Sequence, residues 1–321
     1  MFQNPTHRPI KITYKTPAEI EKMRVAGRLA AEVGFPPGVL NVLNGHGAPA
    51  GSSLTADWDV DRVTFTGSST TGKMVMKSAA DHLAPVSLEL GGKGANLVFD
   101  DADLDNAVYW AVESIFRNAG QICLAGSRLF VQDTIYDEFM KRFVARAEQL
   151  KIGDPLVAGT NFSALSSKKH FDKVASYVRQ ITELGGTVRT GGVATDGSWV
   201  VKPTIADGLA LDAAPYCEEI FGPVCIVNKF STEVEAVHMA NDTRYGLNAM
   251  IFTENLSRAH RVASALKAGT VWVNCFFIRD LRTPFGGVGD SGVGREGGNF
   301  SREFFTEPKA VVMQIDRKLQ G

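Results

Sequence analysis

Apolar and polar positions alternate along the chain in a pattern that predicts short strands separated by amphipathic helices. Helices are predicted over residues 17–33, 73–81, 103–117, 135–150 and 166–184. Runs rich in β-branched and other apolar residues predict strands over residues 39–43, 62–66, 86–90, 96–99, 224–227, 249–252, 271–273 and 310–315. Strands that alternate with helices in this way indicate the α/β fold class.

The first predicted helix has a clear start and stop in the sequence. Thr16 fits the N-cap, Pro17 the first helical position and Glu19 the third position of a capping box. Gly34 fits the stop position, and residues 35–38 (Phe-Pro-Pro-Gly) predict a turn after it.

A glycine-rich turn follows the strand predicted at residues 62–66. Gly67 and Gly72 enclose four residues, and Lys73 comes next. A strand, such a turn and a helix in succession present backbone N–H groups to a phosphate. The spacing matches neither the dinucleotide fingerprint nor the Walker A loop, so a phosphate-binding turn and an ordinary βα turn both stay open.

Glu89 is a charged residue inside the strand predicted at residues 86–90, which ends at Gly91. Strand alternation places Glu89 on the opposite face from Leu88 and Leu90. A carboxylate at this place is either solvated or enclosed in a cleft. In a cleft, burial would raise its pKa and suit it to general-base work.

Composition narrows the classes of function. The 321 residues correspond to about two domains. Lys and Arg total 34 and Asp and Glu 35, and this balance argues against a binder of nucleic acid or of membranes. No apolar run approaches the roughly 18–20 residues that span a bilayer. The four cysteines form no Cys-x-x-Cys pair, so we expect no metal and a reducing cytoplasm.

Five short motifs together carry a family resemblance. They are residues 65–68 (Phe-Thr-Gly-Ser), 88–93 (Leu-Glu-Leu-Gly-Gly-Lys), 120–123 (Gly-Gln-Ile-Cys) with Ser127 and Arg128, 218–223 (Glu-Glu-Ile-Phe-Gly-Pro) and 284–287 (Pro-Phe-Gly-Gly). Each motif is moderately specific, whereas five in this order are very specific. Over residues 34–315 the chain resembles the aldehyde dehydrogenase superfamily.

The resemblance implies an incomplete Rossmann-like cofactor domain plus a catalytic α/β domain. Residues 1–90 would form a partial dinucleotide-binding domain with an atypical segment at residues 1–33, and residues 91–290 the catalytic domain. Residues 291–321 would return to the cofactor domain, and the strand at residues 310–315 would cross a subunit interface. The resemblance thus implies a homo-oligomer, a dimer or a tetramer.

The resemblance also implies a chemistry, the oxidation of an aldehyde with NAD. Cys123 is similar to the catalytic nucleophile of the family and Glu89 to its general base. The cofactor-binding residues implied by matching are Gly67, Ser68, Gly72, Leu90, Glu219 and Phe221. Residues 14–17 (Tyr-Lys-Thr-Pro) do not match the site that selects the adenine-side ribose, so NADP stays open beside NAD.

The substrate is indicated by residues 279–283 (Arg-Asp-Leu-Arg-Thr) and 294–298 (Gly-Arg-Glu-Gly-Gly). Both stretches resemble the hydroxymuconic and aminomuconic semialdehyde dehydrogenases, whose substrates already carry a carboxylate. Either Arg279 or Arg282 would hold that carboxylate through a bidentate contact, or would form a surface ion pair with Asp280. Apolar walls of the substrate tunnel would come from Phe276, Phe277 and Phe285.

Two features depart from the family pattern. No Pro-Trp-Asn-Phe-Pro motif occurs, whose asparagine completes the family's oxyanion hole, so we expect an N-terminally truncated chain with impaired activity. Residues 15–33 resemble the start of type I methionyl aminopeptidase, but none of that enzyme's metal-ligand motifs follows. The alternatives are therefore a catalytically inactive remnant that binds cofactor or oligomerises, and a thiol esterase that uses Cys123 and Glu89.

Overall fold

The computed structural model describes residues 34, 36 and 38–314, which belong to two compact units, Met1–Asp57 and Trp58–Gly321. The helix predicted over residues 17–33, with its capping box, lies outside the described residues. Within the described residues, no helix combines the length and the apolar composition needed to cross a membrane.

The described part of the first unit is short and exposed. A helical turn, Gly47–Gly51, leads directly into α2 (Ser52–Ala56). The strand predicted at residues 39–43 was wrong, since these residues form no strand and Leu43 is 74% exposed. An apolar run becomes a strand only where a neighbouring strand pairs with it, and no described strand lies beside this one.

The smaller sheet of the second unit has three strands, in the order β1-β2-β10. Strand β1 (Val63–Thr66) is parallel to β2 (Val86–Glu89), and β10 (Gly292–Val293) is antiparallel to β2. Helix α3 (Ser69–Ala80) joins β1 to β2 and packs on the sheet through Val75 and Ala79. It starts earlier than predicted because the Ser68 hydroxyl accepts the Thr71 N–H and caps it.

The larger sheet has seven strands in the order β5-β6-β7-β4-β3-β8-β9, parallel except for β5. Its strands are β3 (Ala95–Val98), β4 (Arg128–Gln132), β5 (Thr187–Val193), β6 (Val201–Asp207), β7 (Val224–Phe230), β8 (Asn248–Phe252) and β9 (Thr270–Val273). The central strands are apolar on both faces, as helices covering a parallel sheet require.

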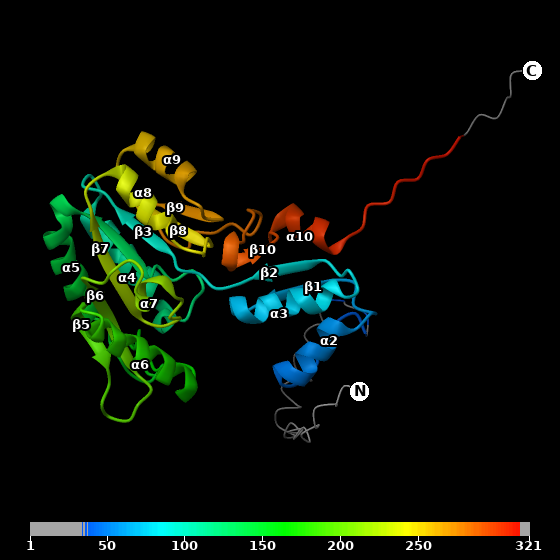
Figure 1. Ribbon diagram of the computed structural model, residues 1–321, viewed down its shortest axis with the longest axis horizontal. Helices are drawn as coiled ribbons and strands as arrows, with labels where there is room; N and C mark the ends of the chain where they lie inside the picture. Colours follow the sequence, from blue (N-terminus) through cyan, green and yellow to red (C-terminus); the bar gives the residue numbers. More distant parts are fainter. Residues whose placement is uncertain (1–33, 35, 37, 315–321) are drawn as a thin grey trace, which may run out of the picture. The chain divides into compact units, whose positions relative to one another are not determined.

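Helices surround this larger sheet (Figure 1). They are α4 (Leu104–Phe116), α5 (Tyr136–Glu148), α6 (Lys168–Glu183), α7 (Ala214–Cys217), α8 (Glu233–Asn241) and α9 (Leu256–Ala265). The predicted α/β class is confirmed. The connection between the two sheets, residues 90–94, is the stretch that also carries the Gly91-Gly92 pair.

The last described residues follow the smaller sheet in the sequence. Helix α10 (Gly298–Phe305) follows β10. Residues 306–314 then form no helix or strand, and Val312 is 94% exposed. The strand predicted at residues 310–315 is therefore absent over the described residues 310–314, because no described strand pairs with this segment, and residue 315 lies outside the described residues.

Candidate active site

A cavity of about 510 Å³ lies where several of the predicted site residues meet. This volume suits a small organic ligand. The lining residues are Thr66, Gly67, Ser68, Leu90, Gly91, Gln121, Ile122, Cys123, His170, Lys173, Glu219 and Phe221. The structure thus brings together residues from four of the five sequence motifs.

Cys123 follows a tight backbone turn after α4. Asn118, Ala119 and Gly120 all have positive φ, at 51°, 53° and 70°. A Cβ at Gly120 would lie 2.3 Å from the Gly222 carbonyl, so only glycine fits there. Two consecutive non-glycine residues in this region store backbone strain, which is typical of functional sites. The turn delivers Cys123 to the cavity wall.

The environment of Cys123 holds its side chain as a thiol. Burial, together with the Glu219 and Glu89 carboxylates, raises its pKa to about 11. The backbone N–H groups of Cys123 and Leu124 act in the opposite direction. Because the thiolate is the reactive form, this cysteine needs a base to become a nucleophile.

Glu89 ends β2 and is only 5% exposed. Both of its carboxylate oxygens are buried and have no hydrogen-bond partner among the described residues. Burial raises its pKa to about 7, helped by Glu296 and opposed by Arg295 and Arg279. The interpretation of Glu89 as a solvated carboxylate is therefore wrong: the side chain is buried, although it is not among the residues that line the cavity of Cys123. A carboxyl that titrates near neutrality is suited to general-base work.

Strand alternation places Glu89 as predicted. Leu88 and Leu90 pack in the core under α3, together with Val75. The Glu89 side chain points to the other face, where a Cβ at Gly286 would lie 2.9 Å from its Oε1.

The Gly91-Gly92 pair lets three segments meet. A Cβ at Gly91 would lie 2.2 Å from the Glu219 carboxylate, and one at Gly92 would lie 2.3 Å from the Cys123 carbonyl oxygen. The Gly92 N–H donates to Glu219 Oε1 at 3.0 Å. Since neither position has room for a side chain, this pair is what allows Glu219 and Cys123 to approach the end of β2.

The residues predicted to bind the cofactor divide into two groups. Gly67, Ser68, Leu90, Glu219 and Phe221 line the cavity. Gly72 is not among the lining residues. A Cβ there would lie 2.4 Å from the Leu90 side chain, so this glycine serves the close packing of α3 on Leu90, the residue after β2.

The cavity has groups that suit two parts of a dinucleotide, its pyrophosphate and one ribose. Ser68, the N-cap of α3, brings the positive end of the helix dipole to the wall, which suits a pyrophosphate. The Glu219 carboxylate, whose pKa burial raises, suits the hydroxyl groups of a ribose. The residues present therefore fit a nicotinamide dinucleotide.

The two candidate substrate arginines differ in their surroundings. Arg282 is paired with Asp280, its Nη2 lying 2.5 Å from Oδ2, and its side chain is 87% exposed. This is the surface ion pair that the sequence offered as the alternative to a substrate contact. Arg279 instead lies over the ring of Phe285, 4.3 Å from its centroid, and close enough to Glu89 to lower the pKa of that carboxyl.

The three phenylalanines predicted for the tunnel lie at different depths. Phe276 is 2% exposed and packs in the core of the larger sheet. Phe277 is half-exposed and has a φ of 58°. Phe285 is partly buried and pairs through its backbone with Glu296.

Sequence reasoning missed several residues around the site. Arg295 donates to the carbonyls of Gly287 and Gly294, and Glu296 bonds the Phe285 backbone in both directions. Glu296 raises the pKa of Glu89, and Arg295 lowers it. Both residues lie in the Gly-Arg-Glu-Gly-Gly stretch, from which only the substrate class had been inferred. His170 and Lys173 of α6 had no comparable signal.

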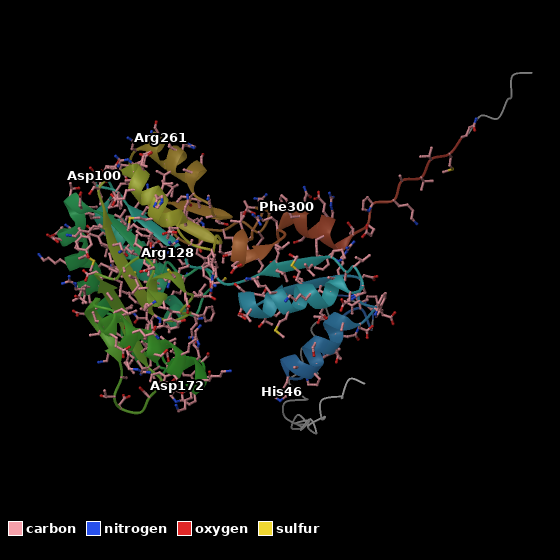
Figure 2. All side chains as sticks on the ribbon, in the orientation of Figure 1. His46, Asp100, Arg128, Asp172, Arg261 and Phe300 are labelled. Carbon is pink, nitrogen blue, oxygen red and sulfur yellow. The ribbon has the colours of Figure 1, made fainter. Side chains whose placement is uncertain are left out.

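Arg128 of the third motif serves the fold. It lies buried on β4 (Figure 2) and donates to three backbone carbonyls, those of Lys93, Met239 and Ala240. Through Lys93 it fixes the start of β3 directly after the Gly91-Gly92 pair. Each of its three nitrogens thus donates to a carbonyl, and such hydrogen bonds offset the cost of burying a guanidinium.

Comparison with known proteins identifies the family. The aldehyde dehydrogenase family matches residues 10–311, and the chain belongs to this family. It is 49% identical over 297 residues to a 2-hydroxymuconic semialdehyde dehydrogenase of Pseudomonas sp. (strain CF600), covering 90% of this chain and 61% of that protein. It is 44% identical over 294 residues to a 2-aminomuconic 6-semialdehyde dehydrogenase of Pseudomonas sp., covering 89% and 60%.

Solved structures agree with this assignment. The NAD+ complex of an aldehyde dehydrogenase from Bacillus cereus superposes with a TM-score of 0.89 at 40% identity, covering 92% of this chain and 60% of that one. The chain thus spans about three-fifths of the length of the relatives it matches.

Proposed function

We propose that this chain carries the catalytic machinery for oxidising an aldehyde to a carboxylate with NAD. The observation that supports it most is the meeting of Cys123 and Glu219 at one cavity, held by the Gly91-Gly92 pair directly after Glu89. A thiol, a base of pKa about 7 and a carboxylate for a ribose are the parts that this reaction needs.

Glu89 starts the proposed reaction by accepting the proton of the Cys123 thiol, which alone would ionise only near pH 11. The thiolate attacks the aldehyde carbon, and the new oxyanion takes the proton back from Glu89 to give a thiohemiacetal on Cys123. Bound NAD would supply the acceptor for the hydride of this adduct, the hydroxyl proton would pass to solvent, and a thioester would remain on Cys123. Glu89 then takes a proton from the water that attacks the thioester, and the carboxylate product leaves with the thiol restored.

Gly67 and Ser68 would face the pyrophosphate, Glu219 would hold the nicotinamide-side ribose, and Phe221 would pack beside it. The donor set at the cavity and the NAD+ bound in the Bacillus cereus relative support this assignment. NADP stays open, because the residues that would select the adenine-side ribose lie outside the described part of the chain.

A semialdehyde that carries a carboxylate is the proposed substrate class. Two relatives with the muconic semialdehyde names support it. Arg279 is the arginine we assign to the carboxylate, since no Asp or Glu lies within ion-pair distance of it in the described structure, whereas Asp280 neutralises Arg282. Phe285 beneath Arg279 would supply the apolar wall.

The proposed domains follow the two sheets. We assign residues 1–90 and 291–321 to the cofactor domain and residues 91–290 to the catalytic domain, in keeping with the smaller and larger sheets. Residues 310–315 would pair with a second copy in a homo-oligomer. Four free cysteines are in keeping with a reducing cytoplasm.

The test is an aldehyde panel that includes a muconic semialdehyde, with NAD or NADP, followed through the absorbance of the reduced cofactor. Turnover that Cys123→Ala abolishes supports the proposal. Ester hydrolysis lost in the same variant, without any cofactor reduction, would show a thiol esterase instead. A folded protein that binds cofactor and catalyses neither reaction would show the inactive remnant.

A further inference from the structure

One face of α6 holds the loop that carries Glu219 and Phe221. His170 Nε2 lies 2.6 Å from the Phe221 carbonyl oxygen, and Lys173 Nζ donates to the Glu219 carbonyl at 3.0 Å. One turn further along, the Tyr177 hydroxyl donates to the Glu218 carboxylate. These three side chains follow each other at helical spacing, so a single rigid helix sets the position of residues 218–221.

The protonation of His170 follows from its partner. A carbonyl oxygen only accepts, so Nε2 of His170 must carry the proton that it donates to Phe221. Burial and the neighbouring Lys173 lower the His170 pKa, which favours the neutral ring at neutral pH. The ring also meets Phe221 edge-on, with centroids 5.8 Å apart and an angle of 66° between the planes.

Phe221 needs this support because its backbone is strained. Its φ is 58°, in the left-handed region that an aromatic residue rarely adopts. The next residue, Gly222, passes so close to α6 that a Cβ there would lie 2.7 Å from Val174. The loop is thus pressed on α6 by packing, and His170 holds the carbonyl of its strained residue.

We propose that His170 is a positioning residue for the nicotinamide cofactor, acting through Phe221. It fixes the carbonyl and the ring of Phe221 in the cavity wall and so sets how tightly the cofactor binds. The inference rests on the proposed function, since it takes the cavity as the cofactor site. Lys173 and Tyr177 secure Glu219 and Glu218 separately, so loss of His170 releases Phe221 without releasing the rest of the loop.

The experiment compares three variants. His170→Leu removes the hydrogen bond and the ring, and His170→Gln keeps an N–H at the place of Nε2. Lys169→Leu, at an exposed position on the same turn, is the matched control. The affinity for reduced cofactor is measured by its fluorescence. Hydrogen exchange of the peptide containing Phe221 is measured without cofactor.

We expect His170→Leu to weaken cofactor binding about 3–10-fold, the range of one ordinary hydrogen bond. Exchange around Phe221 should become faster in the same variant, while kcat at saturating cofactor stays within about twofold, because Cys123 and Glu89 are untouched. His170→Gln should recover most of the affinity, and Lys169→Leu should match the wild type.

Wild-type affinity and wild-type exchange in His170→Leu would overturn the inference, as would a His170→Gln variant no better than His170→Leu. A wild-type chain that binds no reduced cofactor would instead overturn the proposed function. In that case the exchange measurement still tests whether His170 holds Phe221, because it uses the protein without cofactor.

Discussion

The backbone N–H of Gly92 donates to the Glu219 carboxylate at 3.0 Å, across 127 positions of the sequence. This bond joins the chain that follows Glu89 to the loop proposed to hold the ribose. On the other side of the same glycine lies the Cys123 carbonyl oxygen. The proposed base, nucleophile and cofactor ligand are therefore fixed relative to one another by one peptide.

Gly92→Ala should disable this arrangement. Its Cβ would lie 2.3 Å from the Cys123 carbonyl oxygen, which belongs to backbone and cannot turn away. We expect turnover to fall at least about 10²-fold, because displaced catalytic groups lose their alignment with the reacting atoms. Gly51→Ala, where a Cβ meets nothing within 4 Å, is the control and should keep full activity. Comparable activity of the two variants would contradict the assignment.

The pH dependence of kcat/KM should report Glu89. Its pKa is raised to about 7 by burial, so the base form is lost as the pH falls through that value. We expect the rate to rise with pH through a midpoint near 7. The Cys123 pKa, about 11, lies too high to produce this limb. Glu89→Gln should lower the rate about 10²–10⁴-fold and remove the limb. A limb of the same midpoint in Glu89→Gln would assign it to another group.

Arg279→Leu should discriminate between substrates. Loss of a charged hydrogen bond to a substrate carboxylate should lower kcat/KM about tenfold or more for a carboxylated semialdehyde, and little for an uncharged aliphatic aldehyde. Because Arg279 also lowers the pKa of Glu89, the acidic limb should move to higher pH in this variant. Arg282→Leu, which breaks only the exposed pair with Asp280, should leave both quantities unchanged. Equal losses on both substrates would refute the proposed contact.

Deletion of residues 309–321 should lower the oligomeric state. The described part of this segment exposes Val311, Val312 and Met313, and none of the strands that the structure describes pairs with it. An exposed apolar segment of extended backbone is suited to adding a strand to another sheet. Light scattering of the two forms provides the mass. An unchanged mass after the deletion would show that subunits associate elsewhere.

Local signals predicted the elements that lead to the site. Hydrophobic periodicity and glycines at the element ends marked three of them in the sequence. These are the β-branched strand before Gly67, the alternating strand around Glu89 and the helix before Asn118. The strand at residues 39–43 failed, because pairing partners decide whether an apolar run becomes a strand. Strands β4, β5 and β6 and helices α8, α9 and α10 were not predicted, although α8 and α9 begin at side-chain N-caps, Thr232 and Asn255.

The site itself was predicted only where a motif marked it. Cys123, Glu89 and Glu219 stood in recognisable surroundings, yet nothing local indicated that they meet across two sheets. Gly72 was assigned to the cofactor because the sequence does not show its contact with Leu90, which arises only when α3 packs on that residue. His170 was missed for a related reason, since one histidine on an amphipathic helix carries no signal until its partner, the Phe221 carbonyl, is known.

The most direct test of the account is the mass of the Cys123 peptide from the wild-type chain, quenched in acid during turnover of a semialdehyde with NAD. Acid stops the Glu89-assisted hydrolysis and preserves the thioester that has formed up to that moment. The Cys123 peptide should therefore carry the acyl group, which is the mass of the added aldehyde less two hydrogens, and only when NAD is present. Absence of this acyl group with both reagents present, or its formation without NAD, would contradict oxidation through a Cys123 thioester.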